Sequence, residues 1–250
     1  MSDRAPVLVL FDLVSTLTDA GPRYAQAFHD VCKKFGHTPP PPDDLLQTLG
    51  NKNLSEITDH FVGPMNDDIK KDFMRACNAS CDALLYHSDW HEQLYPNVSS
   101  AVQTLNQRGV ITGIFTGTRE DALNAQLDYH RLRPLFDARY IRGKDNDRDG
   151  MKKSDVLKQE QLRDIIGAFG RDHGPGLVVI VGDSAADALA ARNLNLSFIG
   201  FAATDAKKDH LQKAGVQHLF SDFKDLPAAL DQLLNAPANN PIQKISFKNK

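Results

Sequence analysis

Short runs of apolar residues alternate along the chain with longer segments in which apolar residues recur at helical spacing. A mostly apolar run of strand length is typical of a strand that is buried on both faces of a parallel sheet. Runs of this kind lie at 7–11, 111–115 and 177–181, with a weaker one at 196–201. The segments of helical spacing between them lie at 98–108, 120–129, 154–169 and 185–193.

The alternation of strands with helices of about 10–15 residues indicates βαβ units. We therefore expect an α/β fold whose core is a doubly wound, Rossmann-like parallel sheet. Because crossovers between parallel strands are right-handed, the carboxyl ends of the strands meet at one edge, where ligands bind. Residues that directly follow the strands are thus the first candidates for a functional site.

Residues 19–93 interrupt this alternation, because they contain four helical patterns and no convincing strand. The patterns lie at 22–35, 43–49, 54–61 and 67–85. They predict an all-helical domain that is inserted after the first strand. The predicted division is a core of residues 1–18 plus 94–235, a helical insertion of residues 19–93, and a polar, Pro- and Asn-rich tail of residues 236–250.

The charge balance of the chain restricts its partners. The 29 Lys and Arg residues against 32 Asp and Glu residues give a net charge of −3. A protein that coats nucleic acid needs concentrated positive charge, so we expect no nucleic-acid partner. No apolar run approaches the roughly 18 residues of a membrane span, and the amino terminus lacks the basic flank and cleavage site of a signal peptide. We expect a cytoplasmic protein without a membrane partner, and no pattern indicates its oligomeric state.

Acidic residues follow two of the apolar runs. Asp12 comes directly after the run at 7–11, and Asp183 and Asp187 follow the run at 177–181. Two carboxylates about 4 Å apart repel each other by roughly 4 kcal/mol at an effective dielectric of 20, and a divalent cation would remove that repulsion. Oxygen ligands without His or Cys suit Mg²⁺, so these residues predict a Mg²⁺ site.

Other polar residues at the same predicted edge suit a bound phosphate group. Thr116 would donate a hydroxyl hydrogen bond, and Gly117 lets the backbone come close to a ligand. Lys153, at the start of the next helix, would supply a positive charge. Its neighbour Lys152 and the more distant Lys144 are alternatives for that contact.

The segment after the first strand adds backbone donors. The N–H groups that follow Asp12, around Ser15 and Thr16, would form an anion-binding nest. A phosphate held there would leave Asp12 in line for attack on phosphorus, which would give an aspartyl phosphate.

These motifs, taken in order and with their spacing, resemble those of the haloacid dehalogenase (HAD) superfamily of Mg²⁺-dependent phosphohydrolases. They read Asp12-x-x-x-Thr16, Thr116, Lys153 and Gly182-Asp183-Ser184-x-x-Asp187. The helical insertion, which ends before Tyr95-Pro96-Asn97-Val98, resembles the helical cap of the first type in that superfamily. The resemblance covers the whole core.

The resemblance implies a hydrolase that acts on a small phosphorylated or phosphonate metabolite, with Asp12 as the nucleophile and Thr116 and Lys153 as further catalytic residues. It also implies a metal ligand set: the carboxylate of Asp12, the backbone carbonyl of Val14, the carboxylate of Asp183 and, through water, Asp187.

Val14 is a departure from the phosphatase pattern. Phosphatases of the superfamily usually carry a second aspartate at this position, which protonates the leaving oxygen and later activates water. Valine does neither, and such positioned acid–base help contributes roughly 10²- to 10⁴-fold in rate. An ordinary alkyl phosphate ester would therefore be a poor substrate unless another group replaces the aspartate.

Alternatives remain open for the missing acid. A phosphonoacetaldehyde hydrolase-like enzyme would cleave a C–P bond with a cap lysine, and Lys52 is the best-placed candidate for that role and for substrate binding. A phosphatase would use a good leaving group or borrow an acid from the cap, where His87 and His91 are candidates. A non-catalytic metabolite-binding module and a haloacid dehalogenase-type hydrolase are the remaining interpretations.

Overall fold

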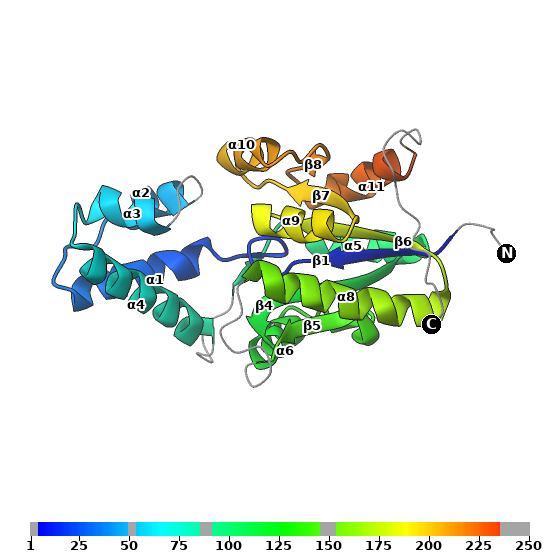
Figure 1. Cartoon of the computed structure of the whole chain (residues 1–250), viewed down its shortest axis with the longest axis horizontal. Coiled ribbons are helices and arrows are strands. Elements are labelled where there is room, and N and C mark those ends of the chain that lie inside the picture. The colour runs from blue at the N-terminus through cyan, green and yellow to red at the C-terminus, as the bar shows by residue number, and fades with distance from the viewer. Residues whose placement is uncertain (1–4, 50–53, 86–91, 146–153, 236–250) are drawn as a thin grey trace. The chain divides into compact units, whose positions relative to one another are not determined.

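The computed structural model of the chain describes residues 5–49, 54–85, 92–145 and 154–235 (Figure 1). It divides into two compact units, one formed by Met1–Thr18 with Leu94–Lys250 and the other by Asp19–Gln93. We call the first unit the core and the second the helical cap. Within the described residues, no helix combines the length and apolar character that a membrane span requires.

The core contains a six-stranded parallel sheet in the order β5-β4-β1-β6-β7-β8, as the doubly wound prediction requires. The first strand of the chain lies in the middle of the sheet, with β4 on one side and β6 on the other. The strands are β1 Val7–Phe11, β4 Ile111–Arg119, β5 Ile141–Lys144, β6 Leu177–Gly182, β7 Ser197–Phe201 and β8 Leu219–Phe220.

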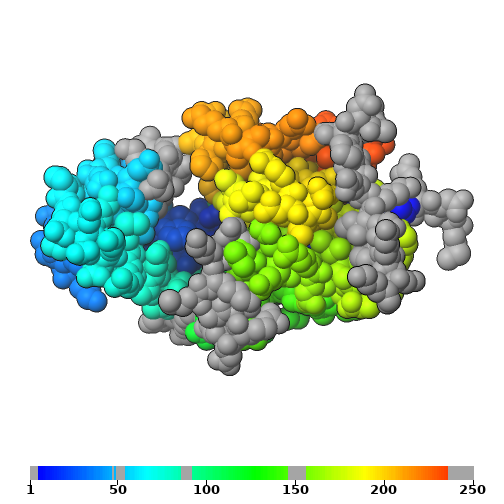
Figure 2. Space-filling view, in the orientation of Figure 1, coloured from blue at the N-terminus to red at the C-terminus, as the bar shows by residue number. Residues whose placement is uncertain are grey.

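Helices cover both faces of this sheet. Along β1, Val9 and Phe11 pack into one apolar cluster with α5, α6 and α11, whereas Leu8 and Leu10 pack into a second cluster with α8 and α9. Figures 1 and 2 show α8 and α9 side by side over the second face. The core helices are α5 Val98–Gln107, α6 Glu120–Tyr129, α8 Ser154–His173, α9 Ala185–Asn193, α10 Asp205–Lys213 and α11 Leu226–Leu234, with short 3-10 turns at Arg133–Leu135, Ala138–Tyr140 and Phe223–Asp225.

The described residues of the helical cap form four helices around an apolar cluster of their own. Phe73 lies at the centre of that cluster, where its ring packs edge-on against Phe28 and Phe35. A buried ion pair joins Arg23 to Glu92, with Nε and Oε1 2.6 Å apart. The cap helices are α1 Gly21–Lys34, α2 Pro42–Leu49, α3 Leu54–Phe61 and α4 Asp67–Leu85.

The chain leaves the core and returns to it at neighbouring positions. The strands β2 Thr18–Asp19 and β3 Gln93–Leu94 form a separate two-stranded sheet. Beside it, the backbone N–H of Tyr95 donates a hydrogen bond of 3.0 Å to the carbonyl oxygen of Leu17. Both residues belong to the core, so the two ends of the insertion start from one place in it.

Several elements differ from the sequence prediction. Strand β4 continues to Arg119, four residues beyond the apolar run, and α8 continues to His173. The edge strand β5 was not predicted because the sequence Ile141-Arg142-Gly143-Lys144 has no apolar run, and α10 was not predicted because it buries only Leu211 as an apolar side chain. Helix α11 was also missed, although its leucines follow helical spacing.

Candidate active site

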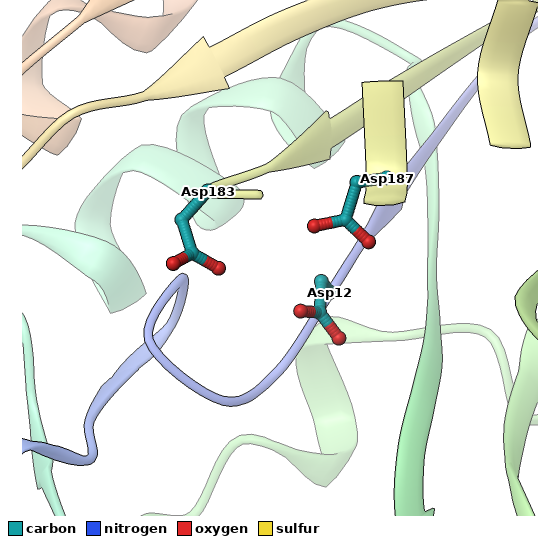
Figure 3. A group of neighbouring side chains, drawn as sticks. All are labelled: Asp12, Asp183 and Asp187. Atoms are coloured by element: carbon teal, nitrogen blue, oxygen red, sulfur yellow. The ribbon is translucent and has the colours of Figure 1, made fainter. Parts of the chain in front are cut away.

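Three carboxylates meet at the carboxyl edge of the sheet. Asp12 follows β1, and its backbone N–H donates a hydrogen bond of 2.9 Å to the carbonyl oxygen of Val181, which ties the two strand ends together. Asp183 follows β6, and Asp187 lies in the first turn of α9. Figure 3 shows these three side chains gathered at one place. One oxygen from each carboxylate lies within 4.8 Å of the others, so the group could hold a metal ion.

Asp187 is fixed by the start of its own helix. The hydroxyl of Ser184 donates a hydrogen bond of 2.6 Å to Oδ2 of Asp187, and the backbone N–H of Asp187 donates one of 3.2 Å back to that hydroxyl. The side chain also lies against Gly182, where a Cβ would come within 2.7 Å of three of its atoms. A residue with a side chain at position 182 would therefore push Asp187 out of its position.

A buried lysine bridges two of these carboxylates. The ammonium of Lys158, on α8, lies 3.0 Å from Oδ2 of Asp12 and 2.6 Å from Oδ1 of Asp187. The sequence analysis predicted Lys153 as the positive charge beside a bound phosphate, and Lys153, like Lys152, lies outside the described residues, so its role remains a prediction. Lys144 ends β5 and is half-buried, and it is Lys158 rather than Lys144 that donates to Asp12.

The charges in this cluster influence one another strongly. Burial raises the pKa of Asp12 to about 7; Lys158 opposes that shift, and the carboxylates of Asp187 and Asp183 add to it. Burial disfavours the charged form of Lys158, but Asp12 and Asp187 outweigh it and raise the lysine pKa above its ordinary value. Oδ1 of Asp12 is buried and has no hydrogen-bond partner among the described residues. An unsatisfied carboxylate oxygen in an acidic, oxygen-only cluster fits a hard divalent cation.

The segment after Asp12 folds back toward the cluster. Thr16 is buried, and its hydroxyl donates a hydrogen bond of 3.0 Å to Oδ1 of Asp183. Ser15 reaches this turn through a left-handed backbone conformation, with φ of 62°. The side chain of Val14 packs against the apolar cluster of the core, which shows why an apolar residue is tolerated at this position. Its carbonyl as a metal ligand remains a prediction.

The second predicted motif lies on the neighbouring strand. Ile114 of β4 pairs with Phe11, so Thr116 extends past it at the same edge as Asp12. The Thr116 hydroxyl donates a hydrogen bond of 3.2 Å to Oγ1 of Thr118. A Cβ added at Gly117 would meet no protein atom within 4 Å, so this glycine borders open space.

Two further polar residues at this edge were not predicted. The side-chain amide of Gln161, one turn after Lys158 on α8, donates hydrogen bonds of 2.9 Å to the carbonyl oxygens of Thr116 and Gly143, which holds β4 and β5 together. Lys207 of α10 donates to Oδ2 of Asp183.

The cap contributions predicted from the sequence are Lys52, His87 and His91, and all three lie outside the described residues. Within the cap, a pocket of about 200 Å³ opens between α1, α3 and α4. It is lined by Tyr24, Phe28, Leu54, Ile57, Cys77, Asn78 and Cys81. The three cysteines of the chain are free and buried, and burial raises the pKa of Cys77 and of Cys81 to about 12, so neither thiol ionises readily.

Comparison with known proteins points to one family. The haloacid dehalogenase-like hydrolase family matches residues 7–195 of the chain. A phosphoglycolate phosphatase of Psychrobacter arcticus is 25% identical over 238 residues, which are 93% of this chain and 98% of the relative. A phosphatase candidate from Clostridium difficile has a similar fold, with a TM-score of 0.68 and 19% identity, over 92% of this chain and all of the other. A haloacid dehalogenase-like family hydrolase of Streptococcus pneumoniae has a TM-score of 0.63 and 18% identity over the same shares.

Proposed function

This chain belongs to the haloacid dehalogenase-like hydrolase family, and from that membership we propose that it is a Mg²⁺-dependent phosphatase of a small phosphorylated metabolite. The observation that carries the proposal is the contact of Lys158 with both Asp12 and Asp187, beside an oxygen of Asp12 that has no partner within the described structure. One oxygen of Asp12 is thus held in place, while the other is buried without a hydrogen-bond partner among the described residues.

Asp12, Asp183 and Asp187 would hold the cation. Such a cation would supply positive charge that offsets the three carboxylates and the phosphate oxygens. It also favours the ionised form of Asp12, whose pKa is otherwise raised to about 7.

The chain's own residues then account for the chemistry. An oxygen of Asp12 forms a bond to phosphorus while the bond from phosphorus to the leaving oxygen breaks, and the leaving group takes up a proton. Water next attacks phosphorus, the bond to Asp12 breaks, and inorganic phosphate is released. Lys158 keeps Asp12 oriented through both steps, and Thr116 together with the open space at Gly117 would accommodate the phosphate oxygens.

Val14 restricts the kind of leaving group that a substrate can carry. No carboxylate stands at this position to give a proton to the leaving oxygen, and the Val14 side chain is packed against the core instead. We therefore expect acyl or aryl phosphates, which leave without such help, to react faster than alkyl esters. The similarity to the Psychrobacter arcticus phosphoglycolate phosphatase makes 2-phosphoglycolate the alkyl ester to compare.

The test is phosphate release from acetyl phosphate, p-nitrophenyl phosphate, 2-phosphoglycolate and phosphonoacetaldehyde, with Mg²⁺ and with EDTA. We expect release that needs the cation, and a loss of about 10³-fold or more in Asp12→Asn, because an amide is a far weaker nucleophile of the same shape. If no compound releases phosphate, or if Asp12→Asn equals the parent, the proposal fails.

The same assay separates the alternatives. Phosphate from phosphonoacetaldehyde alone, with a borohydride-trapped lysine adduct, indicates a phosphonoacetaldehyde hydrolase-like enzyme. Halide release from 2-haloacids in EDTA indicates a dehalogenase. Binding of a phosphorylated metabolite without turnover indicates a non-catalytic module.

A further inference from the structure

Lys207 lies against one of the proposed metal ligands. Its ammonium donates to Oδ2 of Asp183, whose other oxygen, Oδ1, accepts from Thr16 at 3.0 Å. Asp183 therefore has protein donors on both oxygens, in contrast to Asp12, whose Oδ1 has none among the described residues. The pair is partly shielded, with side chains 22% and 10% exposed for Lys207 and Asp183.

Two features of the fold bring Lys207 close to Asp183. Strand β7 pairs with β6 in the register Gly182↔Gly200, so the segment after β7 begins beside Asp183. The side chain of Thr204 caps α10 by accepting a hydrogen bond of 3.2 Å from the backbone N–H of Lys207. That contact fixes the first turn of α10 with Lys207 facing the carboxylates and Lys208 exposed to solvent.

The net charge of the cluster depends on whether Lys207 contacts Asp183. With all three carboxylates ionised and both Lys158 and Lys207 in contact, three carboxylates and two ammonium groups leave a net charge of −1. If Lys207 withdraws, the net charge becomes −2, which matches a divalent cation. An ammonium and a divalent cation on the same carboxylate oxygen would also repel each other.

We propose that Lys207 competes with the divalent cation for Asp183 and thereby lowers the metal affinity of the site. This inference rests on the proposed function, because it requires that the carboxylate cluster binds Mg²⁺. In this proposal Lys207 of α10 is a counter-ion of Asp183 that a bound cation must displace. The site therefore binds the metal only where the free cation concentration is high enough.

Calorimetric titration of the parent with MgCl₂, in the absence of substrate, tests the competition. Lys207→Met keeps the length and apolar stem of the side chain and removes its charge. We expect it to bind Mg²⁺ about tenfold more tightly, because the ion pair no longer has to be broken. Lys208→Met is the matched control, since it removes the same charge from an exposed neighbour, and we expect a change within about twofold.

Three results would overturn the inference while leaving the metal site standing. They are unchanged or weaker Mg²⁺ binding in Lys207→Met, an equal gain in Lys208→Met, and a tenfold gain in Lys207→Arg, which keeps the competing charge. Lys207→Gln provides a second neutral variant if Lys207→Met does not fold, as judged by circular dichroism. Absence of Mg²⁺ binding in the parent would instead refute the proposed metal site, and the inference with it.

Discussion

The ammonium of Lys158 lies 3.0 Å from Oδ2 of Asp12, although the two residues are 146 positions apart in the sequence. The lysine comes from the face of α8 that packs on the sheet, and the aspartate comes from the end of the central strand β1. The proposed nucleophile is thus oriented by a helix that forms part of the hydrophobic core, which couples the chemistry of the site to the packing of that helix.

Replacement of Lys158 by Met should cost activity and stability together. The change removes the charge but keeps much of the volume, so it leaves buried Asp12 and Asp187 without their ammonium partner. We expect a loss of about 10²-fold or more in kcat and roughly 3 kcal/mol in the free energy of unfolding in EDTA. Phosphate release and urea denaturation measure the two effects. A large loss in Lys153→Met with none in Lys158→Met would support the sequence-based prediction of Lys153 and contradict the role proposed for Lys158.

Gly182→Ala should displace Asp187. The new Cβ would lie 2.7 Å from Cβ, Cγ and Oδ2 of a fully buried side chain. We expect a loss of about 1–3 kcal/mol in the free energy of unfolding, and weaker Mg²⁺ binding by calorimetry. Gly117→Ala is the control for stability, because a Cβ there meets nothing within 4 Å. Equal stability of the two alanine variants would contradict the close contact.

Val14→Asp should lower the stability of the protein and add a group for acid catalysis. The valine packs against the apolar cluster of the core, so a carboxylate there should lower the free energy of unfolding by roughly 1–3 kcal/mol. The same carboxylate should raise kcat on 2-phosphoglycolate by about 10²-fold while changing the rate on acetyl phosphate little, because only the first leaving group needs a proton. No gain on 2-phosphoglycolate would indicate that a group elsewhere already donates that proton, and a parallel gain on both substrates would contradict acid catalysis by the new carboxylate.

Asp12 should make the stability of the metal-free protein depend on pH. Its pKa is raised from 3.8 to about 7 in the folded state, mainly by burial, so the folded state binds the proton more tightly than the unfolded state. The resulting stabilisation is fully present below about pH 4 and is lost as the pH rises through 7. Denaturation in EDTA at a series of pH values should therefore show a decline that Asp12→Asn lacks. Identical pH profiles of the two proteins would mean that Asp12 keeps an ordinary pKa.

The ion pair of Arg23 and Glu92 should stabilise the helical cap. Both side chains are buried, and Arg23 also donates a hydrogen bond of 3.1 Å to the carbonyl oxygen of Cys81. Replacing Arg23 by Met leaves Glu92 charged and buried. We therefore expect the free energy of unfolding of the cap to fall by about 3 kcal/mol, as measured by hydrogen exchange of the cap amides. Arg75→Met, which breaks an exposed pair with Asp72 on α4, should cost less than about 1 kcal/mol. Similar losses in both variants would argue against a special role of burial.

The sheet and its acidic edge could be predicted from local patterns. Apolar runs identify buried parallel strands, and parallel strands bring their carboxyl ends together, so the sequence alone predicts Asp12 and Asp183 at one edge. The fold class and the hydrolase family are confirmed. Elements that depend on tertiary packing were missed: β5 is an edge strand with a glycine, and α10 buries one apolar side chain.

The two lysines of the site illustrate the limit of local patterns. A signal for Lys158 did exist, because it stands in phase with Leu162, Ile165 and Phe169 on the buried stripe of α8, where a lysine requires a partner. Lys207 carries no such signal, since α10 is polar throughout most of its length and its contact with Asp183 arises from the pairing of β6 with β7.

The hydrogen bond between Tyr95 and Leu17 has an evolutionary consequence. The chain leaves the core and returns to it at adjacent positions. The connections between the strands of the core sheet therefore do not depend on the length of the inserted segment. A lineage can lengthen, shorten or exchange the 77 residues between Leu17 and Tyr95 at little entropic cost to the remainder. New substrate preferences can thus arise by replacement of the inserted segment, without change to the acidic edge that we propose carries out the reaction.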